Sequence, residues 1–313
     1  MTLVLGLDLG GTKCLGLAVI DGRVVAERRL PTPATGAEVI DVVVEVASRL
    51  MAEVGEPAAI GIGAPGLVDR DGVLRTAPNL PGADELAIGT LVAKRLGHPV
   101  VVDNDATCAV WGERVAGAAA DADHVVLVTL GTGIGGGIIA GGRIYRGANG
   151  FAAEVGHMVV DPDGPPCPCG NRGCWERYAS GSGLGRLARE AAHAGMAPRL
   201  VALAGGDPEA VRGEHVATAV DEGDPAAGRI LGELAWWVAL GLANLANAFD
   251  PELFVIGGGL VGLGDALLIP TRAAFLGLVE SAERRPPIGI VPAALGEHAG
   301  AVGAAALAAE LVA

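Results

Sequence analysis

The order of apolar and polar positions predicts strands that alternate with helices. Residues 3–9 form an apolar run, and a turn at 21–23 separates two further apolar stretches. Apolar side chains then recur at helical spacing from Val39 to Val54. Strands are therefore expected at residues 3–9, 15–20, 24–30, 59–62 and 99–102, and a helix at 39–54. Such a mixture is typical of an α/β protein.

The pattern then starts a second time. An apolar stretch at 125–130 leads into the glycine-rich run 131–137, and a hairpin is expected around Gly141–Gly142. Both halves read strand, glycine-and-threonine turn, strand, which is a weak internal repeat. The repeat predicts two similar lobes that each present a glycine turn to one cleft. Helical segments are expected at 183–226, 228–249 and 298–312, and a strand at 253–256.

The expected division into lobes follows from this repeat. A small N-terminal α/β lobe is expected over residues 1–118, completed by the C-terminal helix 298–313. A large α/β lobe is expected over 119–297, and it contains the cysteine-rich loop 157–174.

Composition and charge narrow the choice of partners. The 313 residues are 51% hydrophobic, and 36 Asp and Glu against 22 Lys and Arg give a net charge of −14. An acidic surface repels nucleic acid and anionic membranes, so neither is expected as a partner. The first strand begins at Leu3 without a basic leader, and no uncharged apolar run reaches the length of a membrane span. Five cysteines in so long a chain are not a disulfide framework, and a cytoplasmic location is expected.

Two glycine turns are candidates for phosphate binding. A phosphate needs several backbone N–H groups at close range, and glycine permits that approach. Two matched copies at the same point of two similar halves strengthen the prediction beyond either turn alone. The predicted phosphate-binding residues are Gly10, Gly11, Thr12, Gly131, Thr132 and Gly133.

Two charged residues flank the first of these turns. Asp8 ends the first strand, where a carboxylate can hold Mg²⁺ against nucleotide phosphates or serve as a turn or cap residue. Lys13 follows the turn and either meets phosphate or is solvated, and both alternatives stay open.

Other glycine motifs fit less well. Residues 6–13 nearly spell a P-loop, but the threonine precedes the lysine, so the hydroxyl that binds Mg²⁺ is misplaced. Residues 61–66 and 131–136 both match G-x-G-x-x-G, yet a dinucleotide fingerprint must open a helix. The first runs into the polar turn 68–72 and the second into a hairpin, so dinucleotide binding is not expected.

Asn104 and Asp105 follow an apolar strand and start a helix. Both residue types are good helix N-caps, which is the plainer interpretation. The alternative is catalytic: Asp105 accepts the proton of an attacking hydroxyl while Asn104 orients a sugar. Position in the sequence does not decide between the two.

The segment from His157 to Cys174 has the composition of a zinc site. Cys167, Cys169 and Cys174 place three thiols in one short loop, with His157 just upstream. One His and three Cys suit a closed tetrahedral zinc site without an open coordination position, so a structural Zn²⁺ is expected. A disulfide between Cys167 and Cys169 would be badly strained.

Two carboxylates flank this loop and are candidates for sugar binding. Glu154 and Glu176 can each accept hydroxyl hydrogen bonds, although both can equally be surface carboxylates. If one ring nitrogen of His157 binds zinc, the other is available to a sugar hydroxyl. The metal and sugar sites are then expected to share a residue.

Motifs along nearly the whole chain resemble the ROK family of bacterial sugar kinases and repressors. The loop of three cysteines with its upstream histidine is highly specific to that family, whereas the DxGGT turn is common to actin-like ATPases. The motifs that carry the resemblance are residues 8–13, 79–82, 103–105, 130–133, 154–158, 167–176, 180–181, 247–252 and 257–259.

The resemblance implies an actin-like ATPase (ribonuclease H-like) fold with two lobes around a nucleotide and sugar cleft. It implies Asp105 as catalytic base, ATP and Mg²⁺ as cosubstrate and metal, and a homodimer or homotetramer. The implied sugar-binding residues are Gly66, Asn79, Asn104, Asp105, Glu154, His157 and Glu176, and Gly257 and Gly258 would contact the adenosine.

Two features depart from the family pattern. Many relatives carry tryptophan where this chain has Ala83, so a different packing of the acceptor loop is expected. The family's repressors carry a DNA-binding helix-turn-helix before the first strand, and here that strand starts at Leu3.

The hypothesis that follows is phosphorylation of a hexose at its 6-hydroxyl, with glucose as the expected substrate. Fructose, mannose, allose, N-acetylmannosamine and N-acetylglucosamine are the alternative acceptors, and polyphosphate is an alternative donor. A non-catalytic sugar sensor is the alternative from another class, and Asp105 argues against it because a sensor needs no base.

Overall fold

Two five-stranded sheets repeat one topology in the computed structural model, which describes residues 2–33, 35–77, 80 and 82–313. The first sheet has the order β3-β2-β1-β4-β7 and the second β10-β9-β8-β11-β12. In both, the earliest strand is central, two hairpin-connected strands lie on one side and two later strands on the other. The predicted internal repeat is thus confirmed. The strands are β1 (Leu3–Leu9), β2 (Lys13–Ile20), β3 (Arg23–Pro31), β4 (Ala59–Ala64), β5 (Leu67–Val68), β6 (Leu74–Thr76), β7 (Val100–Asn104), β8 (Val125–Leu130), β9 (Ile134–Ala140), β10 (Arg143–Ile144), β11 (Leu253–Gly257) and β12 (Gly289–Pro292).

Ten α-helices lie within the described residues. They are α1 (Val39–Val54), α2 (Ile88–Leu96), α3 (Asp105–Ala116), α4 (Glu176–Ala179), α5 (Gly181–His193), α6 (Pro198–Leu203), α7 (Gly213–Asp221), α8 (Pro225–Phe249), α9 (Asp265–Leu278) and α10 (Ala299–Glu310).

The chain divides into two compact units. The first comprises Met1–Leu127, Gly136–Ala153 and Ala293–Ala313, and the second Val128–Gly135 and Glu154–Pro292. The C-terminal residues Ala293–Ala313 thus belong to the same unit as the N-terminal residues. The expected lobe bounds stay a prediction, and in this division residues 119–127, 136–153 and 293–297 fall in the first unit.

One face of the first sheet packs against α1 and α2. Alternate residues of β1 (Leu5, Leu7 and Leu9) are fully buried there, as the two-residue period of a strand requires. The apolar stripe of α1 covers them, and its member Leu50 is also fully buried.

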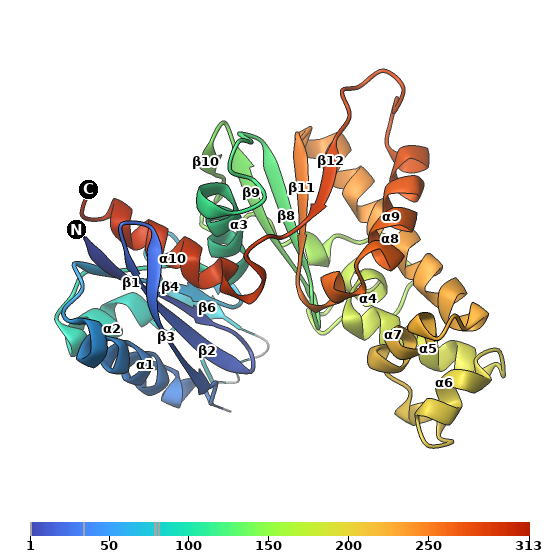
Figure 1. Cartoon of the computed structure of the whole chain (residues 1–313), viewed down its shortest axis with the longest axis horizontal. Coiled ribbons are helices and arrows are strands. Elements are labelled where there is room, and N and C mark those ends of the chain that lie inside the picture. Colours follow the sequence, from blue (N-terminus) through green and yellow to red (C-terminus); the bar gives the residue numbers. More distant parts are fainter. Residues whose placement is uncertain (1, 34, 78–79, 81) are drawn as a thin grey trace. The chain divides into compact units, whose positions relative to one another are not determined.

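The opposite face of this sheet lies against α10, as Figure 1 shows beside β1 and β4. Glycines let the backbones meet. A Cβ on Gly6 would lie 2.0 Å from the Ala301 carbonyl oxygen, and one on Gly61 would lie 1.8 Å from that of Ala304. These distances are impossible for a real side chain, so the alanine-rich tail is a close-packed core helix.

A buried carboxylate fixes the entry into α10. Glu113, near the end of α3, is fully buried and accepts hydrogen bonds from the backbone N–H groups of Ala118, Ala294 and Leu295 at 2.7, 3.1 and 2.8 Å. Three donors satisfy its charge without a cation. The segment that leads into α10 is thereby attached to α3.

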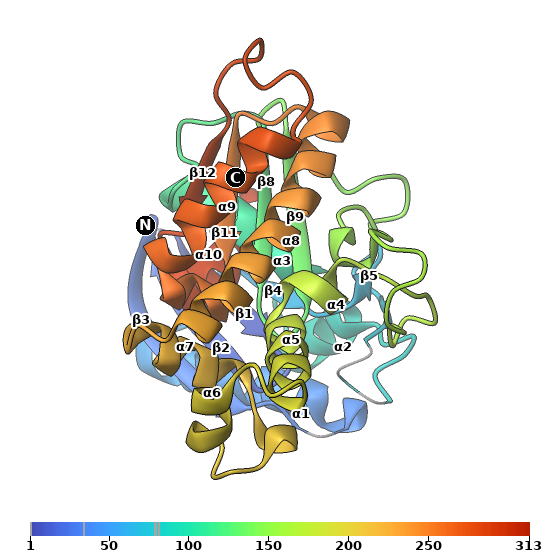
Figure 2. The ribbon, with the colours of Figure 1, turned by 90° about the vertical axis from the view of Figure 1, so that its right-hand side faces the viewer.

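In the second unit the long helix α8 packs along α9, as Figure 2 shows. Asp224 accepts from the N–H of Ala227 at 2.8 Å and Pro225 occupies the first turn, so α8 begins three residues before the predicted start. By length and composition α8 is the one described helix that could cross a membrane, and 61% of its apolar window is buried.

Some elements were not predicted. The apolar pattern predicts no helix at α2 or α9, and α9 contains Pro270, a residue that is unfavourable inside a helix.

The 61–66 motif begins inside β4 and leads into β5. It therefore opens no helix, unlike a dinucleotide fingerprint.

We predict that Gly61→Ala destabilises the protein by about 2–4 kcal/mol, because the new methyl would overlap the α10 backbone. Urea or thermal unfolding measures this. The control is Gly228→Ala in α8, where nothing lies within 4 Å of the added methyl. Equal stability of both variants would contradict the close packing of α10.

Candidate functional site

The structure brings two predicted acidic residues together in the first unit. The strand β1 runs parallel to β4, and β4 runs parallel to β7. The carboxyl ends of parallel strands meet at one sheet edge, so Asp8 near the end of β1 and Asp105 just after β7 share it. The charge on Asp105 raises the pKa of Asp8, which places the carboxylates within electrostatic reach.

Asp8 lies in an unusual electrostatic setting. Burial is the main cause that raises its pKa to about 7, Asp105 raises the pKa further, and Lys13 lowers it. A Cβ on Gly300, in the first turn of α10, would lie 2.7 Å from the Asp8 carboxyl carbon. Glycine at position 300 therefore makes room for Asp8. A cation bound at Asp8 would stabilise the ionised carboxylate, so the Mg²⁺ prediction is compatible with this setting.

Asn104 caps α3 with both ends of its amide engaged. Its Oδ1 accepts from the N–H of Thr107 at 3.0 Å, and its Nδ2 donates to the carbonyl of Gly66 at 3.1 Å. The plainer N-cap interpretation is thus confirmed. The same bond brings Gly66 beside Asn104 and Asp105, as a joint site would need. The roles of Gly66, Asn104 and Asp105 in sugar binding stay predictions.

A salt bridge next to this motif was missed by sequence reasoning. Asp103 is 6% exposed, and its carboxylate accepts from Arg146 Nε at 2.7 Å and from the Asn104 N–H at 2.9 Å. The pair fixes the backbone just before Asn104 and Asp105. Nothing in the sequence around Arg146 signals it, because the partners lie 43 residues apart.

Both predicted glycine turns are three-residue connections between adjacent strands, β1 to β2 and β8 to β9, and their hydrogen bonds differ. In the first, the N–H of Gly10 donates to the Lys13 carbonyl at 2.9 Å. In the second, the N–H of Gly131 donates to the Gly133 carbonyl at 3.0 Å, and Ser182 Oγ donates to the Thr132 carbonyl at 2.6 Å. Phosphate binding by residues 10–12 and 131–133 stays a prediction.

The four predicted zinc ligands gather in the second unit. The candidate atoms of His157, Cys167, Cys169 and Cys174 all lie within 4.8 Å of one another. The sulfurs of Cys169 and Cys174 are 3.6 Å apart, and Cys167 Sγ lies 3.8 Å from His157 Nδ1. A tetrahedral site with Zn–S bonds of about 2.3 Å has edges of about 3.8 Å, so the donor set fits zinc. With all four positions supplied by protein, the zinc would be structural.

One of the two flanking carboxylates, Glu176, lies against this cluster and against the glycine turn 131–133. Glu176 Oε1 is 3.2 Å from Cys167 Sγ and 3.8 Å from His157 Nδ1, and Glu176 Oε2 lies 2.7 Å from a Cβ built on Gly133. Burial raises the pKa of Glu154, His157 lowers it and Glu176 raises it. The predicted shared use of His157 has its geometric basis here: Nδ1 faces the cysteine, which leaves Nε2 for another partner.

Gly257 ends β11, and Gly258, which follows the strand, has φ of +82°. A Cβ on Gly258 would lie 2.6 Å from backbone atoms of Leu130, so the position requires glycine. Their contact with adenosine stays a prediction. Asn79, also predicted to bind sugar, lies outside the described residues.

We predict that Asp8→Asn stabilises the Mg²⁺-free protein more at pH 8 than at pH 5, by on the order of 1–3 kcal/mol. The pKa of about 7 in the folded protein lies above the ordinary aspartate value of 3.8, so between these pH values the carboxyl takes up a proton on folding. Ionised Asp8 therefore costs stability as pH rises through this window. Urea unfolding at both pH values measures the difference.

The matched control is Asp71→Asn, which removes the same charge at an exposed position of the same unit. An Asp8→Asn effect of equal size at both pH values would refute the raised pKa.

We also predict about one zinc per chain in the purified protein, lost together with thermal stability in Cys169→Ser. Elemental analysis and melting curves measure both. The control is Asn171→Ser, an exposed neighbour in the same loop. Full zinc content in Cys169→Ser would rule out the four-ligand site.

Comparison with known proteins agrees with this arrangement. The model of the ROK family matches residues 4–311. A glucokinase from Streptomyces coelicolor is 42% identical over 99% of this chain and 98% of its own, and one from Thermotoga maritima is 36% identical over 97% and 96%. The crystal structure of a ROK family glucokinase from Streptomyces griseus, in complex with glucose and AMPPNP, matches with a TM-score of 0.88 and 41% identity over 98% of this chain and 99% of that one. The predicted actin-like ATPase fold is confirmed, and the chain belongs to the ROK family.

Proposed function

We propose that the protein is a glucokinase that transfers the terminal phosphate of ATP to the 6-hydroxyl of glucose. The observation that carries this proposal is the pair Asp8 and Asp105 at one sheet edge, beside the glycine turn 10–12. The similarity to glucokinases along almost the whole chain supports ATP and glucose as substrates.

Asp105 is the proposed general base. Its backbone is fixed at the first position of α3, and its Oδ1 accepts from the N–H of Ala106 at 2.8 Å. As the sugar oxygen attacks the γ-phosphorus in line, Asp105 takes the hydroxyl proton. The new bond joins the sugar oxygen to phosphorus, and the bond to the leaving ADP oxygen breaks with its electron pair.

The phosphate groups are proposed to contact backbone N–H groups of the two glycine turns and the hydroxyls of Thr12 and Thr132. Mg²⁺ bound through Asp8 would supply positive charge against the phosphates. Gly257 and Gly258 are proposed to contact the adenosine. Lys13 is proposed to contact phosphate once its partner in the structure, Glu297, gives way.

Glucose is proposed to be held by directional hydrogen bonds. Carboxylates and amides that accept or donate to neighbouring hydroxyls distinguish sugars, because a missing hydroxyl leaves a buried polar group unpaired. The zinc would keep the segment with His157 and Glu176 in one conformation. The proposed contacts are Gly66, Asn79, Asn104, Asp105, Glu154, His157 and Glu176.

We propose a homodimer or homotetramer in the cytoplasm, as the family resemblance implies. The net charge of −14 supports a protein that binds neither nucleic acid nor anionic membrane. The mostly buried α8 is consistent with a protein core helix.

We predict that the protein phosphorylates glucose with ATP and Mg²⁺, and that Asp105→Ala lowers kcat by about 10²–10⁴-fold. Fructose, mannose, allose, N-acetylglucosamine and N-acetylmannosamine are assayed in parallel, with polyphosphate as an alternative donor. Formation of the sugar phosphate measures turnover with either donor, and Asp71→Asn is the charge-matched control.

Faster turnover of another sugar than of glucose would show that glucose is not the preferred acceptor. Binding of glucose without turnover of any sugar would contradict the proposed kinase activity and favour a non-catalytic sugar sensor.

A further inference from the structure

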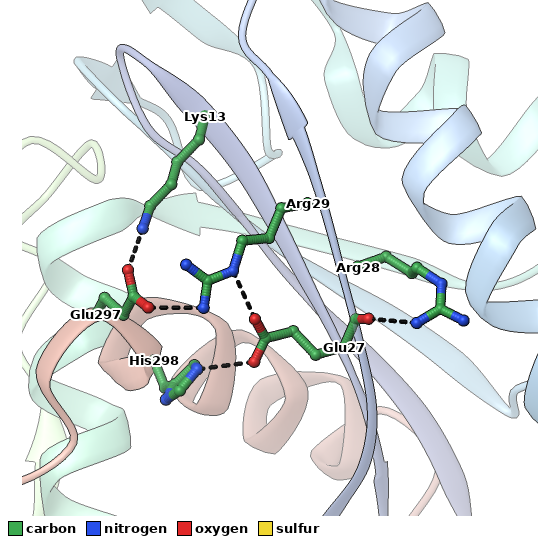
Figure 3. Close-up of polar contacts among 6 residues, drawn as sticks. All are labelled: Lys13, Glu27, Arg28, Arg29, Glu297 and His298. Carbon is green, nitrogen blue, oxygen red and sulfur yellow. Dashed lines mark hydrogen bonds and ion pairs between the residues drawn. The ribbon is translucent and has the colours of Figure 1, made fainter.

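Lys13 belongs to a chain of alternating charges on an exposed face of the first unit (Figure 3). Its ammonium pairs with Glu297, which lies in the short turn before α10. The second carboxylate oxygen of Glu297 accepts from Arg29 at 2.6 Å. Arg29 also donates to Glu27 at 2.5 Å, and Glu27 pairs with His298 at 2.9 Å. The strands β2 and β3 are thus connected to the start of α10.

Lys13 is close to the glycine turn 10–12, to Asp8 and to Glu297. It immediately follows the turn, and its charge lowers the pKa of Asp8. Its ammonium nevertheless points to Glu297, as Figure 3 shows. Hydrogen bonds from Lys13 and Arg29 lower the pKa of Glu297 to about 2, so this carboxylate is an anion at any working pH.

We propose that Glu297 is an internal competitor of the nucleotide phosphates for Lys13. It weakens nucleotide binding and favours the release of ADP by recapturing the ammonium. The inference rests on the proposed function, in which residues 10–12 bind phosphate. Glu297 acts through Lys13 and is a positioning residue.

Exposure and geometry both favour such an exchange. The Lys13 and Glu297 side chains are 39% and 45% exposed, and exposed ion pairs of this kind hold their partners weakly. A lysine ammonium is a compact charge on a flexible stem, so it can move between two anions. Arg29 stays bonded to Glu297 when Lys13 leaves, which keeps the carboxylate paired in both states.

The test compares nucleotide affinities of the full-length protein without sugar. Isothermal titration with ADP·Mg²⁺ and with a non-hydrolysable ATP analogue gives Kd for wild type, Glu297→Gln, Lys13→Met and the double variant. We predict that Glu297→Gln lowers both Kd values about three- to tenfold. Lys13→Met is expected to raise them, and Glu297→Gln is expected to have no effect when combined with Lys13→Met.

The matched control is Glu53→Gln. Glu53 pairs with Arg28, the residue before Arg29 in β3, and its side chain is 43% exposed. Its substitution changes the net charge by the same amount as Glu297→Gln, but its ion pair is with Arg28 and not with Lys13. Its Kd values are expected to equal those of wild type. An equal gain in Glu53→Gln would show a general charge effect and overturn the proposal.

Weaker binding in Glu297→Gln would show that the carboxylate helps Lys13 reach phosphate, which overturns the competition. A gain that persists without Lys13 overturns it as well. Unchanged affinity in Glu297→Gln beside normal glucose phosphorylation overturns this inference alone. Absence of nucleotide binding in every variant, wild type included, overturns the proposed function together with the inference.

Discussion

The first unit depends on the contact between the backbone of α10 and three other elements. Gly6 on β1 and Gly61 on β4 meet carbonyl groups of α10, and Gly303 on α10 meets the Cys108 carbonyl of α3 at a distance that excludes any Cβ. Side chains of ordinary size would separate these layers. The same helix places Gly300 against Asp8. The helix that closes the core of the first unit therefore also helps to bury the Asp8 carboxyl group.

Glu113 extends this constraint to α3. It binds the segment before α10 to α3, and α3 begins at Asp105. The parallel strands β1, β4 and β7 bring Asp8 and Asp105 to one sheet edge, and α10 contacts both β1 and α3. The burial that this packing imposes on Asp8 is the main cause of its raised pKa.

Sequence patterns predicted local structure and short-range chemistry well. The strands around residues 10–12, the cap at Asn104 and the cluster of His157 with three cysteines all depend on residues that lie in one short stretch of the chain, at most 17 positions apart (174 − 157) in the cluster. Long-range pairings were missed: Asp103 with Arg146, Glu113 with residues 294–295, and Lys13 with Glu297. Each pairing joins residues that lie dozens to hundreds of positions apart in the sequence. The periodicity of apolar residues gives no information about such contacts. A helix was predicted at 298–312, but the glycines that pack against it became recognisable only in three dimensions.

The order of the elements along the chain has a consequence for synthesis on the ribosome. The residues 299–310 that cover one face of the first sheet are translated after the whole of the second unit. Until they emerge, this face of β1 and β4 lacks its covering helix while the second unit is synthesised. Because exposed apolar surface invites misassembly, this face is the surface of the first unit that its own chain covers last during biosynthesis.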